Sequence, residues 1–297
     1  MKRRAIQLGG RTLLVSIPYS WALEHGVTKG RELTVTETSQ GLIVQTGDAK
    51  PKMKKAFIEA KNCGRLLRRI VLAYYLKGFN EVHVSHTSKE IKPLQNLSSD
   101  MIGFEITSQT QTTTIFQDFS EKDEKNYENV VSRAFMILKT MLAETFSNPG
   151  KETLESIKQM DLNLNKMCHY CWRYSYKNNL GSSESSILQI IANSLEKAGD
   201  AWKECVEMSI EENSQNTLKN IHQPIEKLLS AVLSFTLKRS SVHALECADA
   251  YDSIIELLKK SPRHKIFLPA SQLVNNIINI QSLQLGMLND VKSDEEF

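Results

Sequence analysis

Apolar and polar residues alternate over short stretches near the start of the chain, which is the pattern of half-buried β-strands. Four such strands are expected within residues 2–46, and the apolar residues that mark their faces are Leu13, Val15, Ile17, Leu33, Val35 and Leu42. Between the second and third strands, Pro18 fixes a φ suited to a helix start, and Gly26 can end a helix in the left-handed conformation. A helix of about two turns is therefore expected over residues 19–25.

The next part of the chain mixes helical and strand patterns. Apolar residues recur at helical spacing after Met53, so one helix is expected to begin there and to end before Gly78. The elements expected after it are strands over residues 81–85, 103–107 and 112–117 and a short helix over residues 88–97. Together these elements predict a small α/β layer.

From residue 120 onward the spacing of apolar residues is helical throughout. Breaks in this pattern separate six expected helices, over residues 121–146, 152–177, 185–210, 217–238, 242–260 and 268–289. Each is long enough to pack as a member of a helical bundle, and in groups of three they look like a tandem repeat. The expected fold class is α+β, with three domains over residues 1–47, 53–118 and 120–297.

The first of these domains is too short to bury a core of its own, because small domains leave a large share of their surface in water. A second copy of the chain is the simplest partner, since the apolar strand faces could then pack against their two-fold mates. The sequence therefore predicts a homodimer held together by its N-terminal domain.

Charge is distributed unevenly along the chain. Of its 297 residues, 41% are hydrophobic and 24% are charged, which suits a globular protein of two or three domains. The formal net charge is only +3, yet residues 1–78 carry 15 Lys and Arg against 5 Asp and Glu, or +10, which leaves 22 against 29, or −7, for the rest. A basic first part indicates a polyanionic partner.

Cysteine usage and the absence of a long apolar stretch indicate the compartment. The five cysteines are an odd number without a disulfide pattern, which fits a reducing cytoplasm. Cys168 and Cys171 have zinc-like spacing, but no second Cys or His pair follows, so two packed thiols are the simpler interpretation. The basic start lacks the apolar run of a signal peptide, and the run over residues 70–76 is too short to span a bilayer. We expect a soluble, cytoplasmic protein.

Basic residues gather around the first strand and the glycine turn after it. Lys2, Arg3, Arg4 and Arg11 lie in this segment, and two-fold symmetry would double their number. Phosphate neutralisation by Lys and Arg supplies much of the affinity of a DNA-binding module. The same residues could serve only to keep the chain in solution, and charge alone does not separate the two interpretations.

The motif of this segment is carried by residues 4–18, Trp21, residues 25–27, residues 29–30 and residues 33–35. It resembles the AbrB/MazE-like (SpoVT-AbrB) swapped-hairpin DNA-binding domain. The resemblance implies an intertwined dimer that places basic residues of the first strand and the following loop on double-stranded DNA. In this chain those residues are Lys2, Arg3, Arg4, Arg11 and Thr12. Tyr19 stands where a Lys often follows the Pro, and Arg31 where an Asp is usual, so the target DNA sequence does not transfer.

An acidic face is expected on the helix over residues 185–210. Glu196, Asp200 and Glu204 follow one another at intervals of four, which stacks three carboxylates on one side of a helix. A bound cation would relieve their repulsion, and oxygen ligands suit a divalent metal or iron. A solvated acidic face explains the same spacing.

The stretch around these acids, residues 195–204, resembles the signature helix of the PhoU domain, whose two three-helix repeats match the layout of residues 120–289. The resemblance implies that the first two acids form a Glu-x-x-x-Asp pair able to hold a multinuclear metal cluster. In the second repeat Ala250 stands four residues after Glu246, so one of the two pairs is broken. A swapped-hairpin domain joined to a PhoU-like domain resembles archaeal regulators of phosphate uptake.

Aromatic and basic residues alternate near the end of the helix expected over residues 152–177. The residues concerned are Trp172, Arg173, Tyr174, Tyr176 and Lys177. A base-stacking platform would use such a pattern, but buried rings with basic residues at an exposed rim are the simpler interpretation.

The residues above predict a binding protein and not an enzyme, since no nucleophile, general base or phosphate-cradling loop can be named. We expect a DNA-binding transcription regulator of phosphate uptake or phosphate homeostasis, with the helical domain as sensor or interaction domain. The alternative is a dimeric adaptor that does not bind DNA and contacts a phosphate-transport or signalling partner through the helical domain.

Overall fold

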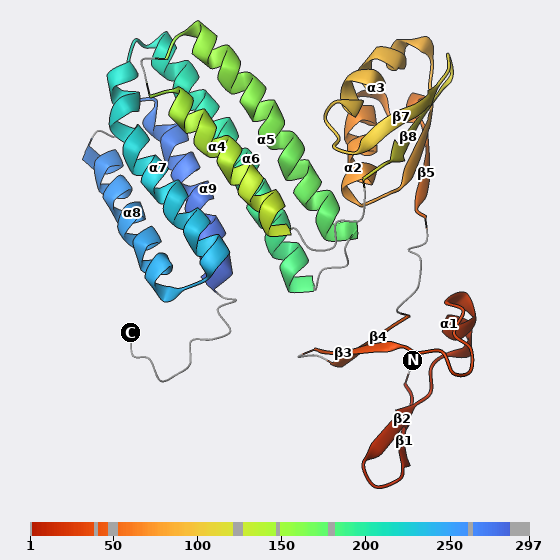
Figure 1. Ribbon diagram of the computed structural model, residues 1–297. Helices are drawn as coiled ribbons and strands as arrows, with labels where there is room; N and C mark the ends of the chain where they lie inside the picture. The colour runs from red at the N-terminus through yellow and green to blue at the C-terminus, as the bar shows by residue number, and fades with distance from the viewer. Residues whose placement is uncertain are drawn as a thin grey trace. The chain divides into compact units, whose positions relative to one another are not determined.

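The computed structural model describes residues 2–38, 41–46, 53–120, 127–146, 149–177, 182–260 and 264–285. It shows an α+β protein, with strands in the N-terminal part and helices in the C-terminal part (Figure 1). The chain divides into two compact units, Met1–Met53 and Lys54–Phe297.

The first unit contains two hairpins and a short helix. Two antiparallel pairs form the hairpins, β1 (Ala5–Leu8) with β2 (Thr12–Val15) and β3 (Thr34–Thr38) with β4 (Gly41–Gln45). The helix α1 (Tyr19–Glu24) follows Pro18 and ends before Gly26, whose φ of +63° lies in the left-handed region that glycine favours. The four strands and the short helix expected from the sequence are confirmed.

Apolar side chains of the first unit remain in contact with solvent. The exposed fraction is 61% for Ile6, 67% for Leu13 and 61% for Val15. No apolar side chain whose exposure is described between residues 2 and 46 is buried. Full burial of such a side chain would stabilise the fold by about 1.5–3 kcal/mol. Because these side chains are exposed, the described part of this unit lacks a core of its own. Intertwining with a second chain stays a prediction.

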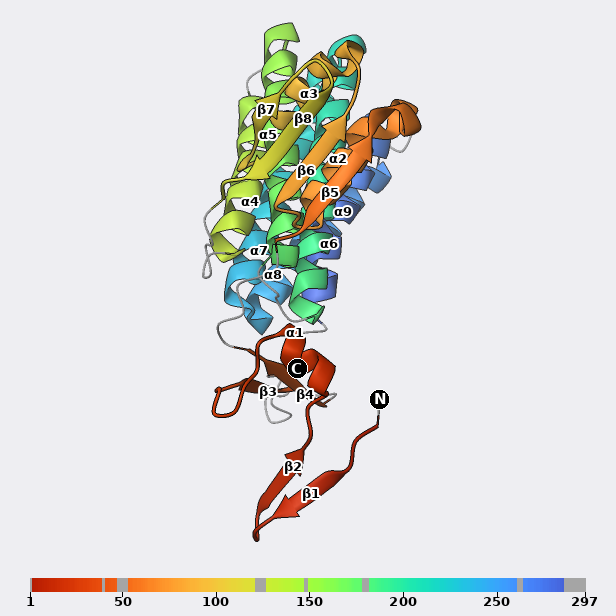
Figure 2. The same cartoon turned by 90° about the vertical axis from the view of Figure 1, so that its right-hand side faces the viewer.

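The second unit begins with a four-stranded sheet in the order β5-β6-β8-β7 (Figure 2). Its strands are β5 (Lys55–Glu59), β6 (Glu81–Ser85), β7 (Phe104–Gln109) and β8 (Thr113–Asp118). The strands β5 and β6 run parallel, and the other pairs are antiparallel. The helices α2 (Leu67–Leu76) and α3 (Ile91–Ser98) cover one face of the sheet and share a core with Phe104 and Phe116.

The prediction of a helix that begins at Met53 is wrong for its first half. Residues 55–59 form the strand β5, two 3-10 turns follow within residues 60–66, and only α2 is α-helical. Ala56 and Ile58 are buried while the other residues of β5 are exposed, which is the alternation of a strand. The parallel pairing with β6 decides the outcome, because local spacing carries no information about a partner so far along the chain.

The rest of the second unit is a helical bundle. Its helices are α4 (Tyr127–Glu144), α5 (Lys151–Lys177), α6 (Ser182–Glu211), α7 (Gln215–Lys238), α8 (Ser241–Lys260) and α9 (Phe267–Leu285). The six helices expected from the sequence are confirmed, whereas their grouping into two related repeats stays a prediction. None of the helices that the structure describes is both long and apolar enough to cross a bilayer.

The helix α6 packs against α4, α5, α7 and α9 and supplies much of the core. Trp202 is fully buried, and its Nε1–H donates to the carbonyl oxygen of Met141 in α4 at 3.2 Å. At Gly199 the helices α5 and α6 approach closely, since a Cβ there would lie 2.5 Å from Cδ2 of Leu164. Polar residues of α5 and α6 near this glycine therefore face each other at short range.

Candidate functional site

The residues predicted to contact DNA lie at both ends of the first hairpin. Lys2, Arg3 and Arg4 precede β1, Arg11 lies in the turn between β1 and β2, and Thr12 begins β2; all five are exposed. A four-residue strand spans roughly 14 Å. The structure therefore brings the first three together at one end of the hairpin and places Arg11 at the other.

The three carboxylates of the predicted metal site lie along α6. The side chain of Glu196 is 28% exposed and that of Asp200 is 44% exposed, while Glu204 is also exposed. No three His, Cys, Asp or Glu side chains within the described ranges are grouped so that they could hold a metal ion. Two lysines of α6 lie among these acids instead.

Lys203 bridges acids from two helices. Its ammonium lies 2.5 Å from Oδ2 of Asp161 in α5 and 3.0 Å from Oδ1 of Asp200. Asp161 is only 4% exposed, and its Oδ1 has no hydrogen-bond partner among the described residues. Lys197 continues the row, with its ammonium 3.4 Å from Oδ2 of Asp200 and 3.7 Å from Oε1 of Glu196. These five residues are named the charge row.

Burial and pairing perturb the two central members of the charge row. Burial raises the pKa of Asp161, and the Lys203 ammonium offsets this only in part. Burial alone would lower the pKa of Lys203, but its hydrogen bonds with two carboxylates outweigh burial and raise it. Both pKa values are raised because the carboxylate is nearly enclosed, whereas the less buried ammonium has two acidic partners. Lys203 is therefore protonated at neutral pH.

The charge row does not fit the metal cluster that the PhoU resemblance implies. Metal ligands converge on one point, but Lys203 occupies the position between Asp161 and Asp200, and Lys197 lies beside the remaining oxygen of Asp200. An ammonium group and a metal ion repel each other at such a distance. In α8 the position of the missing acid is taken by Ala250, which is buried.

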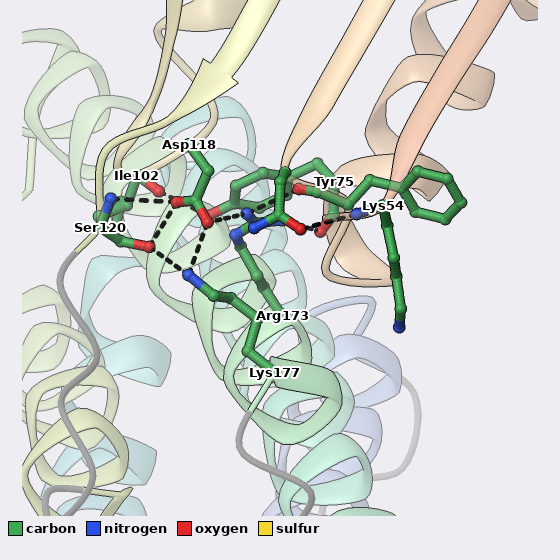
Figure 3. Close-up of polar contacts among 9 residues, drawn as sticks. Lys54, Tyr75, Ile102, Asp118, Ser120, Arg173 and Lys177 are labelled. Atoms are coloured by element: carbon green, nitrogen blue, oxygen red, sulfur yellow. Dashed lines mark hydrogen bonds and ion pairs between the residues drawn. The ribbon is translucent and has the colours of Figure 1, made fainter. Parts of the chain in front are cut away.

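A second cluster of charged residues joins the sheet to the bundle (Figure 3). Arg173 of α5 is completely buried, and it donates from Nη1 to the carbonyl oxygen of Tyr75 at 2.6 Å and from Nη2 to that of Phe79 at 2.8 Å. Its Nη2 also lies 2.8 Å from Oδ2 of Asp118 at the end of β8. The expectation of an exposed rim position for Arg173 is wrong, because residues 94 and 98 positions away in the sequence enclose it.

Lys177, one turn after Arg173, completes this junction cluster of Arg173, Lys177 and Asp118. Its ammonium donates to Oδ2 of Asp118 at 2.6 Å and to Oγ of Ser120 at 2.8 Å. Burial would raise the pKa of Asp118, but hydrogen bonds from Lys177 and Ser120, followed by the guanidinium charge, outweigh it and lower the pKa. The end of α5 is thus fastened to the sheet by charge-assisted bonds that are largely shielded from water.

The Cys168 and Cys171 thiols are buried and free. Burial raises the pKa of Cys171 to about 12, and it raises that of Cys168 well above its ordinary value. Both thiols belong to the apolar core of the bundle, where they pack as small side chains.

Comparisons with protein-family models, with curated proteins and with solved structures give no match for this chain. The resemblances to the AbrB/MazE-like and PhoU-like domains therefore rest on sequence motifs alone.

Proposed function

We propose that this chain is a dimeric DNA-binding transcription regulator whose first unit contacts double-stranded DNA. The observation that carries the proposal is the exposure of the apolar strand residues within residues 2–46. Exposed apolar side chains in such number call for a partner, and a second copy would bring two identical basic hairpins into one body.

The charge and shape of the hairpin support DNA as the ligand. Exposed basic residues lie at both ends of a two-stranded ribbon, and a ribbon of this kind fits the major groove. The formal charge of +10 over residues 1–78 would attract the phosphate backbone. Lys2, Arg3, Arg4, Arg11 and Thr12 are the proposed contacts.

The helical bundle is the proposed signal-receiving part of the regulator. Its resemblance to the PhoU domain points to phosphate uptake or phosphate homeostasis as the regulated process. Residues 79–297 carry a formal charge of −7, which disfavours DNA contact by this part and suits a protein partner.

Salt titration of DNA binding tests the proposal. Duplexes selected from genomic fragments would be titrated with the full-length protein, and with a variant carrying Arg3→Ala, Arg4→Ala and Arg11→Ala, by fluorescence anisotropy. If all three arginines neutralise phosphates, a dimer loses six contacts, and the slope of log K against log salt becomes shallower by about 5. The control replaces three exposed lysines of the second unit, Lys89, Lys92 and Lys238, by Ala and should keep the slope.

Two results would contradict the proposal. Negligible binding to every duplex at low salt would remove DNA as the ligand and favour the adaptor. Equal slopes for the arginine variant and the lysine control would show that the first hairpin is not the contact surface.

A further inference from the structure

We infer that Lys203 is a built-in cation of the α5–α6 interface, so that lysine offsets most of the negative charge of the charge row and the row takes no metal ion. The inference does not depend on DNA binding, because it concerns only contacts within the second unit.

The close approach of α5 and α6 creates the need for a cation. A Cβ at Gly199 would lie 3.3 Å from Oδ1 of Asp161, so this carboxylate is pressed against the backbone of α6. Only 4% of Asp161 is exposed, and an ionised carboxylate in such a place is costly unless a positive charge lies beside it. The neutralising charge must therefore come from within the interface.

Lys203 is placed to supply that charge. It follows Gly199 by one turn of α6, its side chain is 27% exposed, and its ammonium bridges Asp161 and Asp200 at 2.5 and 3.0 Å. A flexible aliphatic stem allows a lysine to pack along an interface while its ammonium reaches a polar edge. The ammonium thereby neutralises carboxylates of two helices, as a bridging metal ion would.

The charge count of the row supports the same conclusion. Two lysines and three acids leave a net charge of −1, so the repulsion that would favour a metal ion is already largely removed. A metal ion between Asp161 and Asp200 would have to displace the Lys203 ammonium. Glu204, the third acid of the sequence pattern, is exposed to solvent.

Manganese titration and unfolding of the full-length protein test the inference. The electron paramagnetic resonance signal of free Mn²⁺ should be unchanged by one equivalent of wild-type protein at neutral pH. Lys203→Ala should lower the thermal midpoint at least about three times as much as the control Lys197→Ala, whose side chain is 50% exposed. The double variant Asp161→Asn with Lys203→Ala should recover most of this loss, because no buried charge remains.

Three results would overturn the inference. The first is that wild-type protein removes the free Mn²⁺ signal stoichiometrically, and that the Asp161→Asn or Asp200→Asn variant no longer removes it. The second is an equal shift of the midpoint in Lys203→Ala and Lys197→Ala. The third applies if Lys203→Ala does not fold. In that case the double variant Asp161→Asn with Lys203→Ala should still fold, since a neutral interface should be stable, and its failure to fold would overturn the inference.

Discussion

Replacing Arg173 by Met tests whether the junction cluster holds the sheet to the helical bundle. The change keeps the aliphatic volume but removes two hydrogen bonds to backbone carbonyls and the ion pair with Asp118. The side chain of Arg173 is 0% exposed and that of Asp118 is 4% exposed, so among the described residues this nearly buried carboxylate keeps only Lys177 as its cation. A hydrogen bond from a charged group is worth about 1.5–3 kcal/mol, so the loss of two such bonds together with the ion pair should cost about 3–5 kcal/mol of unfolding free energy. For a unit of this size the thermal midpoint should fall by roughly 6–20 °C.

The matched control is Arg68→Met, which removes an arginine from an exposed ion pair. Arg68 Nη2 lies 2.6 Å from Oδ2 of Asp100, but the arginine side chain is 66% exposed, so water screens the pair and its loss should have little effect. Urea denaturation followed by circular dichroism compares the two variants, and Asp118→Asn completes a double-mutant cycle with Arg173→Met. If the unfolding free energies of Arg173→Met and Arg68→Met lay within about 1 kcal/mol of each other, the reasoning would be refuted.

Three further changes probe other contacts. The pKa of the Asp118 carboxyl lies below its ordinary value of 3.8. Its ionised form therefore stabilises the fold above pH 3.8, and this stabilisation is lost as the pH falls through the folded-state pKa. In urea titrations, the unfolding free energy lost between about pH 5 and about pH 2 should be smaller for Asp118→Asn than for the wild type. Gly199→Ala should destabilise the bundle by about 1–3 kcal/mol, because its Cβ meets a leucine methyl group of α5 at 2.5 Å. The control Gly150→Ala should not destabilise the bundle, because no atom lies within 4 Å of the added Cβ. Equal thermal midpoints for Gly199→Ala and Gly150→Ala would contradict the close approach of α5 and α6. Leu13→Lys should give a monomer in light scattering. The control Val242→Lys changes a residue of α8 that is 62% exposed, and it should leave the dimer intact. A dimer of Leu13→Lys would exclude the N-terminal interface.

Local spacing was sufficient for most elements but not for β5. The six bundle helices and the strands of the first unit follow from apolar periodicity and from turns at Gly and Pro, which are properties of neighbouring residues. Residues 55–59 also match a helical pattern when continued into α2, and only the parallel partner β6 makes them a strand. Pairing partners of this kind are not visible in a window of ten or twenty residues.

The candidate sites show the same limit. A spacing of four placed Glu196, Asp200 and Glu204 on one side of α6, yet it did not show that Lys203 also reaches Asp161 of α5. Arg173 carried no local signal of burial, because the groups that receive its hydrogen bonds belong to the sheet layer.

Apart from β5, the sequence by itself determined where most helices and strands form and which of their faces are apolar, since these depend on residues a few positions apart. Only the tertiary structure decided which charges meet. Lys203 lies 42 positions from Asp161, and Arg173 lies 98 positions from Tyr75. Contacts over such separations arise from the packing of whole elements, and packing also determines which charged groups lose water and must be paired inside the fold.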